Sequence, residues 1–182
     1  MDKAFRKLKD RNKELYTLAN IDSLTKIRNR RSFFIESEEA LKIAIKKNHN
    51  LCVLMIDLDH FKSINDKYGN AIGDRVLIEF CVIVNLCLDN QAIFGRIGGE
   101  EFCITFFDKD IKEINDIAEK IRENCANKQI LLEKNEILNF TVSMGLSCRE
   151  NLNNIDKILQ KSDELLYEAK KSGRNRLIRF NR

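Results

Sequence analysis

The stretch AIFGRIGGEEFCITFF, residues 92–107, contains two apolar runs separated by a short polar turn. Each run includes β-branched or aromatic residues, which predicts two strands of a hairpin. The turn holds Gly98 and Gly99, followed at once by Glu100 and Glu101. Glycines permit positive φ and remove Cβ atoms, so they explain a tight turn and the approach of a phosphate equally well. Two adjacent glutamates repel each other, and their presence at the turn requires an explanation.

The segments around this hairpin alternate between helical periodicity and short apolar runs. We expect helices at residues 31–48, 61–69, 74–90, 110–127 and 155–171, and further strands at 51–59, 137–147 and 176–180. A hairpin inside such a pattern excludes an all-parallel sheet. The sequence therefore favours an α+β fold, with helices packed on a mainly antiparallel sheet.

The 182 residues are enough for one domain with a sizeable core. Residues 1–19 are polar and helix-favouring, with apolar residues spaced three and four apart. We divide the chain into this helix or coiled-coil stalk and a domain of residues 20–182. A solvated helix explains the stalk pattern equally well, because the pattern lasts for fewer than three heptads.

The composition indicates a globular protein, since 43% of the residues are hydrophobic and 33% are charged. No apolar run is long enough to cross a bilayer, and the N-terminus lacks the apolar core of a secretory signal, so we expect a cytoplasmic protein without a membrane segment. The net charge of +4 is interspersed with acidic residues, which gives no nucleic-acid footprint. The six cysteines show no CxxC spacing, and we expect buried free thiols rather than a zinc site.

A second group of carboxylates lies at the end of the apolar run 51–59. Asp57 and Asp59 are two residues apart, so both project from one face if the strand continues that far. Solvated aspartates at a strand end explain this pattern too. If the hairpin lies beside the strand, however, three or four carboxylates gather at one sheet end, with only one of the adjacent glutamates facing Asp57. Mg²⁺ held by a few carboxylates and substrate phosphates commonly compensates such a cluster.

Two basic residues, Lys170 and Arg174, end the last predicted helix and enter the turn at Gly173. Positive charge at this end of a helix interacts favourably with the helix dipole. The same side chains can reach phosphate oxygens. The residues alone leave both interpretations open.

Together these motifs resemble the GGDEF domain, the catalytic domain of diguanylate cyclases. GGEEF at residues 98–102 is the signature in its glutamate-containing form, and four further blocks follow the family pattern over residues 19–176: DSLTKIRNRRSF (22–33), DLDHFKSINDKYGNAIGD (57–74), FTVSMGLS (140–147) and LLYEAKKSGRNR (165–176). The resemblance implies a five-stranded, mostly antiparallel sheet flanked by helices, similar to the palm of nucleotidyl cyclases and polymerases.

The resemblance implies that two GTP molecules are condensed into cyclic di-GMP and two pyrophosphates in bacterial second-messenger signalling, with Mg²⁺ or Mn²⁺ as a pair of ions per active site. Asp57, the backbone carbonyl of Leu58 and Glu100 are the implied metal ligands. Glu100 is also the implied proton acceptor for the ribose 3′-OH, and Glu101 is its essential neighbour. Secondary candidates at the same site are Asp59, Phe61, Gly98 and Gly99.

The substrate contacts follow from the same resemblance. Asn65 and Asp74 are the implied guanine-binding residues, and the Asp74 carboxylate can accept from the N1 and N2 donors that adenine does not offer in the same pattern. The implied phosphate contacts come from Lys62, with a catalytic role, and from Lys170 and Arg174. Asn70 stands where the family commonly has His, so we expect a substrate contact of altered strength.

The chain departs from the family at the product-inhibition motif. The family has RxxD five residues before the signature glycines, whereas DNQA occupies residues 89–92 here. We therefore expect no feedback through that site. One active site holds one GTP, so catalysis is expected to require a homodimer. The N-terminal helix is the expected dimerising or signal-transmitting stalk, with an upstream sensor if the chain is a fragment.

Three other functions stay open at this point. A catalytically weak domain could act as a GTP-binding regulatory module. A cyclase of relaxed specificity would also make mixed or adenosine-containing products, which Asp74 disfavours. A purely structural dimerisation domain would leave the carboxylates unexplained.

Overall fold

The computed structural model describes residues 3–149 and 152–180. At its centre lies a five-stranded sheet in the order β2-β3-β1-β6-β7. The strands are β1 (Leu51–Leu58), β2 (Ile93–Arg96), β3 (Glu101–Phe107), β6 (Val142–Cys148) and β7 (Leu177–Arg179). Only the β6–β7 pair is parallel among the strand pairs of this sheet. The predicted α+β fold with a mostly antiparallel sheet is confirmed.

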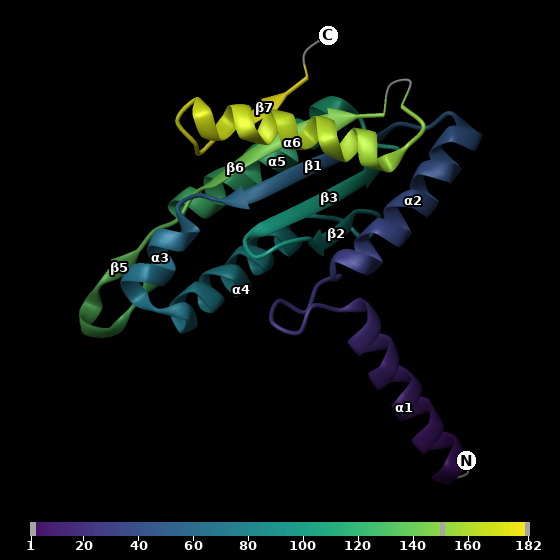
Figure 1. The fold of residues 1–182 in the computed structure, drawn as a ribbon, viewed down its shortest axis with the longest axis horizontal. Helices are drawn as coiled ribbons and strands as arrows, with labels where there is room; N and C mark the ends of the chain where they lie inside the picture. Colours follow the sequence, from purple (N-terminus) through teal and green to yellow (C-terminus); the bar gives the residue numbers. More distant parts are fainter. Residues whose placement is uncertain (1–2, 150–151, 181–182) are drawn as a thin grey trace.

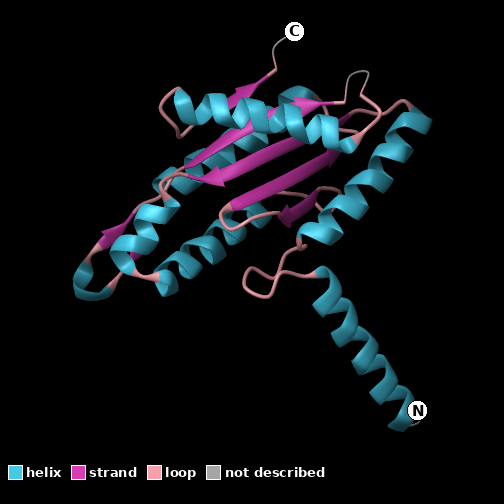
Figure 2. Cartoon of the chain, in the orientation of Figure 1, coloured by secondary structure: helices cyan, strands magenta, loops and turns pink. Residues whose placement is uncertain are grey.

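Helices cover both faces of the sheet (Figures 1 and 2). α2 (Arg30–Lys47) and α6 (Ile155–Lys171) lie on one face, and α4 (Asn70–Cys87) and α5 (Ile111–Asn127) lie on the other. The short α3 (Phe61–Tyr68) follows β1 directly. The expected order of helices and strands is confirmed for all of these elements.

α1 (Lys3–Asn20) projects away from the domain (Figure 1). The stalk predicted at residues 1–19 includes Met1 and Asp2, which lie outside the described residues. Several apolar side chains of α1 are exposed, namely Phe5, Leu15, Tyr16 and Leu18. The helix is therefore present with unburied apolar side chains, and its division from the domain stays a prediction.

The strand predicted at residues 137–147 is wrong as a single element. Ile137–Leu138 forms β5, which pairs with β4 (Ile130–Leu131) in a separate two-stranded hairpin around a short 3₁₀ helix (Glu133–Asn135). The chain then passes through residues 139–141 before β6 begins. Two-residue strands carry too little periodicity to be seen in a sequence.

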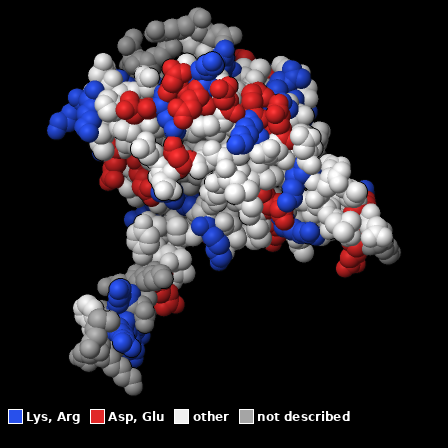
Figure 3. All heavy atoms as spheres, turned by 180° about the vertical axis from the view of Figure 1, so that it is seen from behind, with Lys and Arg blue, Asp and Glu red and all other residues white. Residues whose placement is uncertain are grey.

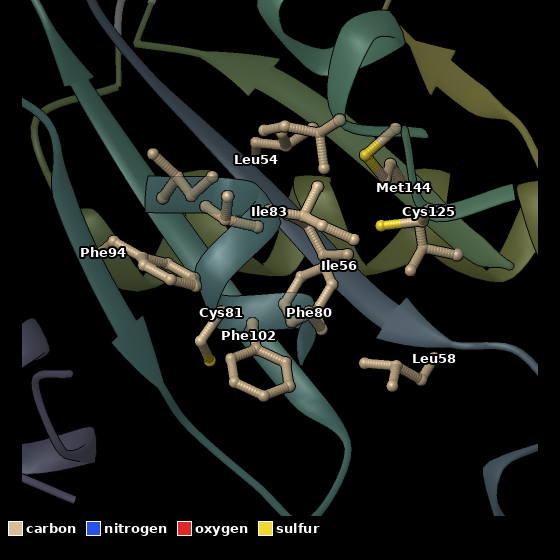
Figure 4. Close-up of a cluster of buried hydrophobic side chains, with 14 of the residues drawn as sticks. Leu54, Ile56, Leu58, Phe80, Cys81, Ile83, Phe94, Phe102, Cys125 and Met144 are labelled. Atoms are coloured by element: carbon tan, nitrogen blue, oxygen red, sulfur yellow. The ribbon is translucent and has the colours of Figure 1, made fainter. Parts of the chain in front are cut away.

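The strands alternate their side chains between two cores. Leu54, Ile56 and Leu58 of β1 point toward α4 and α5, where they meet Phe80 and Phe102 (Figure 4). The side chains of the intervening β1 residues pack instead against α2 and α6. Because the period of a strand is two, Asp57 lies on the α6 side of the sheet.

The expectation of free thiols is wrong for one pair of cysteines. Cys52 at the start of β1 and Cys148 at the end of β6 are cross-strand partners and form a disulfide. Their register brings together residues 96 positions apart, which spacing in the sequence does not reveal. The other four cysteines, Cys81, Cys87, Cys103 and Cys125, are free.

Reduction of this disulfide is expected to destabilise the protein. A cross-link that closes a loop of 96 residues removes freedom mainly from the unfolded chain, so its loss lowers the free energy of unfolding by up to about 4 kcal/mol. Chemical denaturation with and without reductant measures the difference. The Cys52→Ser/Cys148→Ser variant is the control, because reductant has no bond to break in it. Six alkylatable thiols in the denatured, unreduced protein would contradict the pairing.

Charged side chains of both signs are interspersed over the face of the molecule that is turned away in Figure 1 (Figure 3). The described residues visible on this face form no extended basic patch of the kind that binds a nucleic-acid backbone. Among the described residues, no helix combines the length and the apolar character that a membrane crossing requires.

Candidate active site

The predicted carboxylates meet at the sheet end where β1 finishes and the β2–β3 hairpin turns. Asp57 lies directly opposite Glu101 in the β1–β3 register, and the backbone N–H of Leu58 donates to the carbonyl of Glu100 (3.3 Å). Cross-strand partners project from the same face, so Glu101 shares the α6 side with Asp57. Glu100 instead lines a cavity beside α3 and α4. Glu100 precedes β3, so the register places Glu101, rather than Glu100, opposite Asp57, and the charges of both glutamates act on Asp57.

The glycines of the hairpin act through space rather than through unusual backbone angles. Neither Gly98 nor Gly99 has positive φ, so that explanation of the turn is wrong. A Cβ atom on Gly98 would lie 2.3 Å from Oε2 of Glu101, and a Cβ atom on Gly99 would meet nothing within 4 Å. Gly98 therefore makes room for the Glu101 carboxylate, and Gly99 leaves an open approach to the turn.

Arg96 holds the hairpin in place. Its guanidinium donates to the carbonyls of Gly98 (3.2 Å) and Gly99 (2.7 Å), and it forms an ion pair with Asp22 (3.1 Å). Asp22 also accepts hydrogen bonds from the N–H and hydroxyl of Thr25. The sequence analysis did not name Arg96 as a site residue, and Asp22 was noted only within the DSLTKIRNRRSF block.

Asp57 carries a charge that its surroundings compensate only in part. Its side chain is 10% exposed, and Lys170 lies 2.8 Å from Oδ2. Burial raises the pKa of Asp57 to about 6; Lys170 opposes this shift, and the nearby charges of Glu100 and Glu101 add to it. The sheet end therefore holds more negative charge than the lysine neutralises, which is the condition under which a cation binds.

The donor set fits a hard divalent cation that shares its coordination with a substrate. The available donors are the oxygens of Asp57, Glu100, Glu101 and the Leu58 carbonyl, which suit Mg²⁺ or Mn²⁺. Within the described ranges, no three His, Cys, Asp or Glu side chains are arranged to hold an ion by themselves. Mg²⁺ characteristically binds to one or two carboxylates and takes its other ligands from phosphates and water.

A cavity of about 400 Å³ opens beside this sheet end, between the hairpin and the α3–α4 pair. It is lined by Phe61, Lys62, Asn65, Asn70, Asp74, Leu77, Arg96, Gly99 and Glu100. The structure thus brings together Lys62, Asn65, Asn70, Asp74 and Glu100 from the predicted set. Asp57 and Lys170 meet behind the cavity on the α6 side, and Arg174 lies in the turn after α6.

Asn65 offers an unused acceptor. Its Oδ1 is buried and has no hydrogen-bond partner among the described residues. A buried amide oxygen without a donor is unfavourable, and a ligand with N–H groups in the cavity would satisfy it. A Cβ atom on Gly73 would lie 1.8 Å from this Oδ1, so the amide occupies space that only a glycine at position 73 leaves. Gly73 is a further site residue that the sequence analysis missed.

The resemblance implies GTP as the ligand of this cavity, and replacing Gly73 by alanine is expected to weaken its binding about tenfold while leaving the fold intact, because the methyl group displaces the Asn65 amide. Alanine also favours the helix over glycine, so the melting temperature is expected to stay the same or rise. Calorimetric titration with GTP measures the affinity. Asn65→Ala is the matched variant and is expected to lose a similar amount, with no further loss in the double variant. Unchanged GTP affinity in Gly73→Ala would contradict this role.

An α+β domain with carboxylates at one sheet end, beside a cavity that holds an unsatisfied amide, has the features of a ligand-binding domain. The chain belongs to the GGDEF domain family. The family model described as "Diguanylate cyclase, GGDEF domain" matches residues 19–176.

A curated relative, diguanylate cyclase A from Treponema denticola, is 35% identical over 170 residues, which cover 91% of this chain and 46% of that protein. The chain spans about half the length, or less, of the first curated relatives that it matches.

Solved structures agree on the fold. The coiled coil and GGDEF domain of DgcB from Caulobacter crescentus, in complex with c-di-GMP, match with a TM-score of 0.93 at 26% identity, over 97% of this chain and 94% of that chain. The active GGEEF domain of a diguanylate cyclase from Vibrio cholerae matches with a TM-score of 0.78 at 32% identity, over 85% of this chain and 97% of that chain.

Proposed function

We propose that this protein is a diguanylate cyclase, which condenses two GTP molecules into cyclic di-GMP and releases two pyrophosphates. The observation that carries the proposal is the arrangement of the sheet end: the signature hairpin lies beside Asp57, whose pKa is raised to about 6 by burial and further by the charges of Glu100 and Glu101. Curated relatives at 35% identity are named diguanylate cyclases, which supports this reaction.

Different residues of the site bind the guanine base, the phosphates and the metal in this proposal. Asn65 and Asp74 bind the guanine edge in the cavity, where Asn65 holds its free acceptor. Lys62 and Arg174 bind the phosphates, and Lys170 joins them when it exchanges Asp57 for a phosphate oxygen. Asp57, the Leu58 carbonyl and Glu100 would hold Mg²⁺ or Mn²⁺, which would supply polarisation of the phosphates and a lower barrier to deprotonation of the 3′-OH.

The proton transfer is assigned to the hairpin. Glu100 lines the cavity in which the nucleotide binds, and its carboxylate accepts the proton of the 3′-OH. Glu101, the cross-strand partner of Asp57, contributes negative charge next to it and keeps its place because Gly98 has no side chain. The 3′-OH then attacks the α-phosphorus of the second GTP, and pyrophosphate leaves.

Each domain holds one GTP, so the reaction requires two domains that face each other. α1 carries exposed apolar side chains that suit pairing with a second copy. The DgcB structure that includes a coiled coil aligns with 97% of this chain, so the aligned part includes most of α1. This match supports a stalk at this position. A signal from an upstream domain would reach the active site through this helix.

Product feedback through the RxxD site is absent in this proposal. Asp89 stands in place of the arginine, pairs with Lys109 (2.7 Å), and has a pKa below its ordinary value, chiefly because Lys109 donates a hydrogen bond to it. A carboxylate at this position repels a phosphodiester, and Ala92 supplies no polar group. Preincubation with micromolar cyclic di-GMP is therefore expected to leave the initial rate unchanged. A noncompetitive loss of rate would contradict this expectation.

A reaction that consumes GTP places the protein in the cytoplasm. Thiols are kept reduced there, so the Cys52–Cys148 disulfide of the structure is expected to open in the cell, with the loss of stability described for its reduction. Alkylation of thiols at the moment of lysis, followed by mass measurement, distinguishes the two states.

The second candidate function is a catalytically weak domain that binds GTP as a regulatory module. The buried, unpartnered Asn65 oxygen supports nucleotide binding without requiring turnover. Pyrophosphate release from GTP and Mg²⁺, measured at protein concentrations at which the chain is dimeric by sedimentation, separates the two. Steady release supports the cyclase. Saturable GTP binding without release would support the module instead.

A further inference from the structure

Both carboxylate oxygens of Asp59, the second aspartate of the DLDHF segment, accept hydrogen bonds from protein donors. Its side chain is buried, with an exposed fraction of 3% for the residue. Oδ1 accepts from the hydroxyl of Ser143 (2.6 Å), and Oδ2 accepts from the hydroxyl of Thr141 (2.7 Å) and from the backbone N–H of Asn175 (3.0 Å). No Lys, Arg or His side chain in the described ranges pairs with it, in contrast to Asp57.

These bonds connect three distant parts of the chain. Asp59 follows β1, Thr141 directly precedes β6, Ser143 lies in β6, and Asn175 lies in the turn between α6 and β7. The backbone N–H of Asp59 also donates to the carbonyl of Thr141 (2.9 Å). The first two contacts join neighbouring strands that are already paired. The contact to Asn175 is different, because it ties down a turn.

The turn that Asp59 holds has an unusual backbone. Gly173, Arg174 and Asn175 all have positive φ, at 114°, 63° and 46°. For residues other than glycine this conformation is uncommon, and it persists where the surroundings determine it. The bond from Asn175 N–H to a buried carboxylate is charge-assisted, so it is stronger than a neutral hydrogen bond. A second contact, from Arg122 to the Asn175 side chain (3.2 Å), acts on the same residue.

We propose that Asp59 positions the Gly173–Arg176 turn, and with it Arg174, so that the Arg174 guanidinium is in place to bind the phosphates of a nucleoside triphosphate. The inference rests on the proposed function, in which Arg174 binds phosphate. Asp59 acts through the backbone of Asn175, so it is a positioning residue rather than a metal ligand or a catalytic residue.

The test compares ligands that differ in their phosphates. Affinities for GTP, supplied with Mg²⁺ as its 3′-deoxy analogue so that no turnover occurs, and for guanosine are measured by calorimetry for the wild type, Asp59→Asn, Arg174→Ala and the double variant. Ser143→Ala is the matched control, since it removes a donor to Oδ1 and leaves the Asn175 contact in place. Hydrogen exchange of the Asn175 amide is followed in the unliganded wild type and in Asp59→Asn.

We expect Asp59→Asn to weaken GTP binding about tenfold, as Arg174→Ala does, with guanosine affinity unchanged. The double variant should bind GTP no more weakly than the weaker single variant, since both changes remove one contact. In the wild type the Asn175 amide should exchange about a hundredfold more slowly than in an unstructured peptide, and this protection should fall in Asp59→Asn.

Several results would overturn the proposal. One is a loss of GTP affinity in the double variant that equals the product of the two single losses. Another is a loss of GTP affinity in Ser143→Ala as large as in Asp59→Asn. The last is exchange of the wild-type Asn175 amide as fast as in an unstructured peptide. The last measurement needs no variant, so it decides the question even if Asp59→Asn fails to fold. Wild-type protein that binds no GTP, while its Asn175 amide is protected, would contradict the proposed function and leave the structural role of Asp59 intact.

Discussion

Replacing Asp57 by asparagine is expected to abolish cyclic di-GMP synthesis and, at the same time, to make the metal-free protein more stable at pH 7. The activity is lost because asparagine offers a neutral amide in place of a charged metal ligand. Loss of turnover by about a thousandfold or more is the expected scale for removing a ligand of the reacting centre. Glu101→Gln, which removes the charge opposite Asp57, is expected to abolish turnover as well.

The gain in stability follows from the sign of the pKa shift. The pKa of Asp57 is raised from 3.8 to about 6, so the folded protein binds this proton more tightly than the unfolded chain does. The corresponding stabilisation is complete below about pH 4 and is lost as the pH rises through 6. At pH 7 the buried charge costs roughly 1 to 3 kcal/mol, and a neutral asparagine removes that cost.

Urea denaturation of metal-free protein between pH 4 and 8 measures this difference. The wild type is expected to lose stability relative to Asp57→Asn over that interval. Asp66→Asn, at an exposed position on α3, is the matched control and should follow the wild type. Equal pH profiles for wild type and Asp57→Asn would show that Asp57 does not bear an unfavourable charge.

Gly145→Ala is expected to destabilise the protein more than a methyl group added at any other position of the sheet. Gly145 lies in the middle of β6, and a Cβ atom there would lie 2.1 Å from the carbonyl oxygen of Ser162 and 2.3 Å from the backbone nitrogen of Leu166. Both atoms belong to the backbone of α6, so neither can rotate aside. Overpacking of this kind costs about 3 kcal/mol, or more where the helix must shift.

Gly145→Ala is also expected to affect GTP binding, because it displaces α6. Lys170 lies in the last turn of this helix, which leads into the turn of Arg174, so displacement of α6 also moves the proposed phosphate-binding residues. Thermal unfolding and GTP affinity are therefore expected to fall together in Gly145→Ala. Gly99→Ala is the control for stability, because no atom lies within 4 Å of the added Cβ. Similar melting temperatures for the two variants would contradict the close packing of α6 on β6.

Much of this fold could be predicted from the sequence because its elements carry clear periodicity. The apolar run that became β1 and the helical pattern that became α6 were placed within a residue of their observed ends. The hairpin β4–β5 was missed because its strands are two residues long. The disulfide was missed because it depends on the register between β1 and β6, which no local pattern encodes.

The candidate site was predictable in its residue types and less so in its geometry. Residues of the 57–74 block that are close in the chain, such as Lys62, Asn65 and Asp74, do line one cavity. The pairing of Lys170 with Asp57 was not foreseen, since it joins residues on α6 and β1. Gly73 and Arg96 were passed over because their roles, making room for an amide and holding two carbonyls, appear only when the neighbours are known.

The most direct test of the account is the identity of the product. Purified protein is incubated with Mg²⁺ and an equimolar mixture of GTP and ATP, and the cyclic dinucleotides and pyrophosphate are identified by mass spectrometry and quantified. The account predicts cyclic di-GMP as the product, with two pyrophosphates for each molecule formed. Mixed or di-adenosine products, or GTP binding without any cyclic dinucleotide, would contradict it.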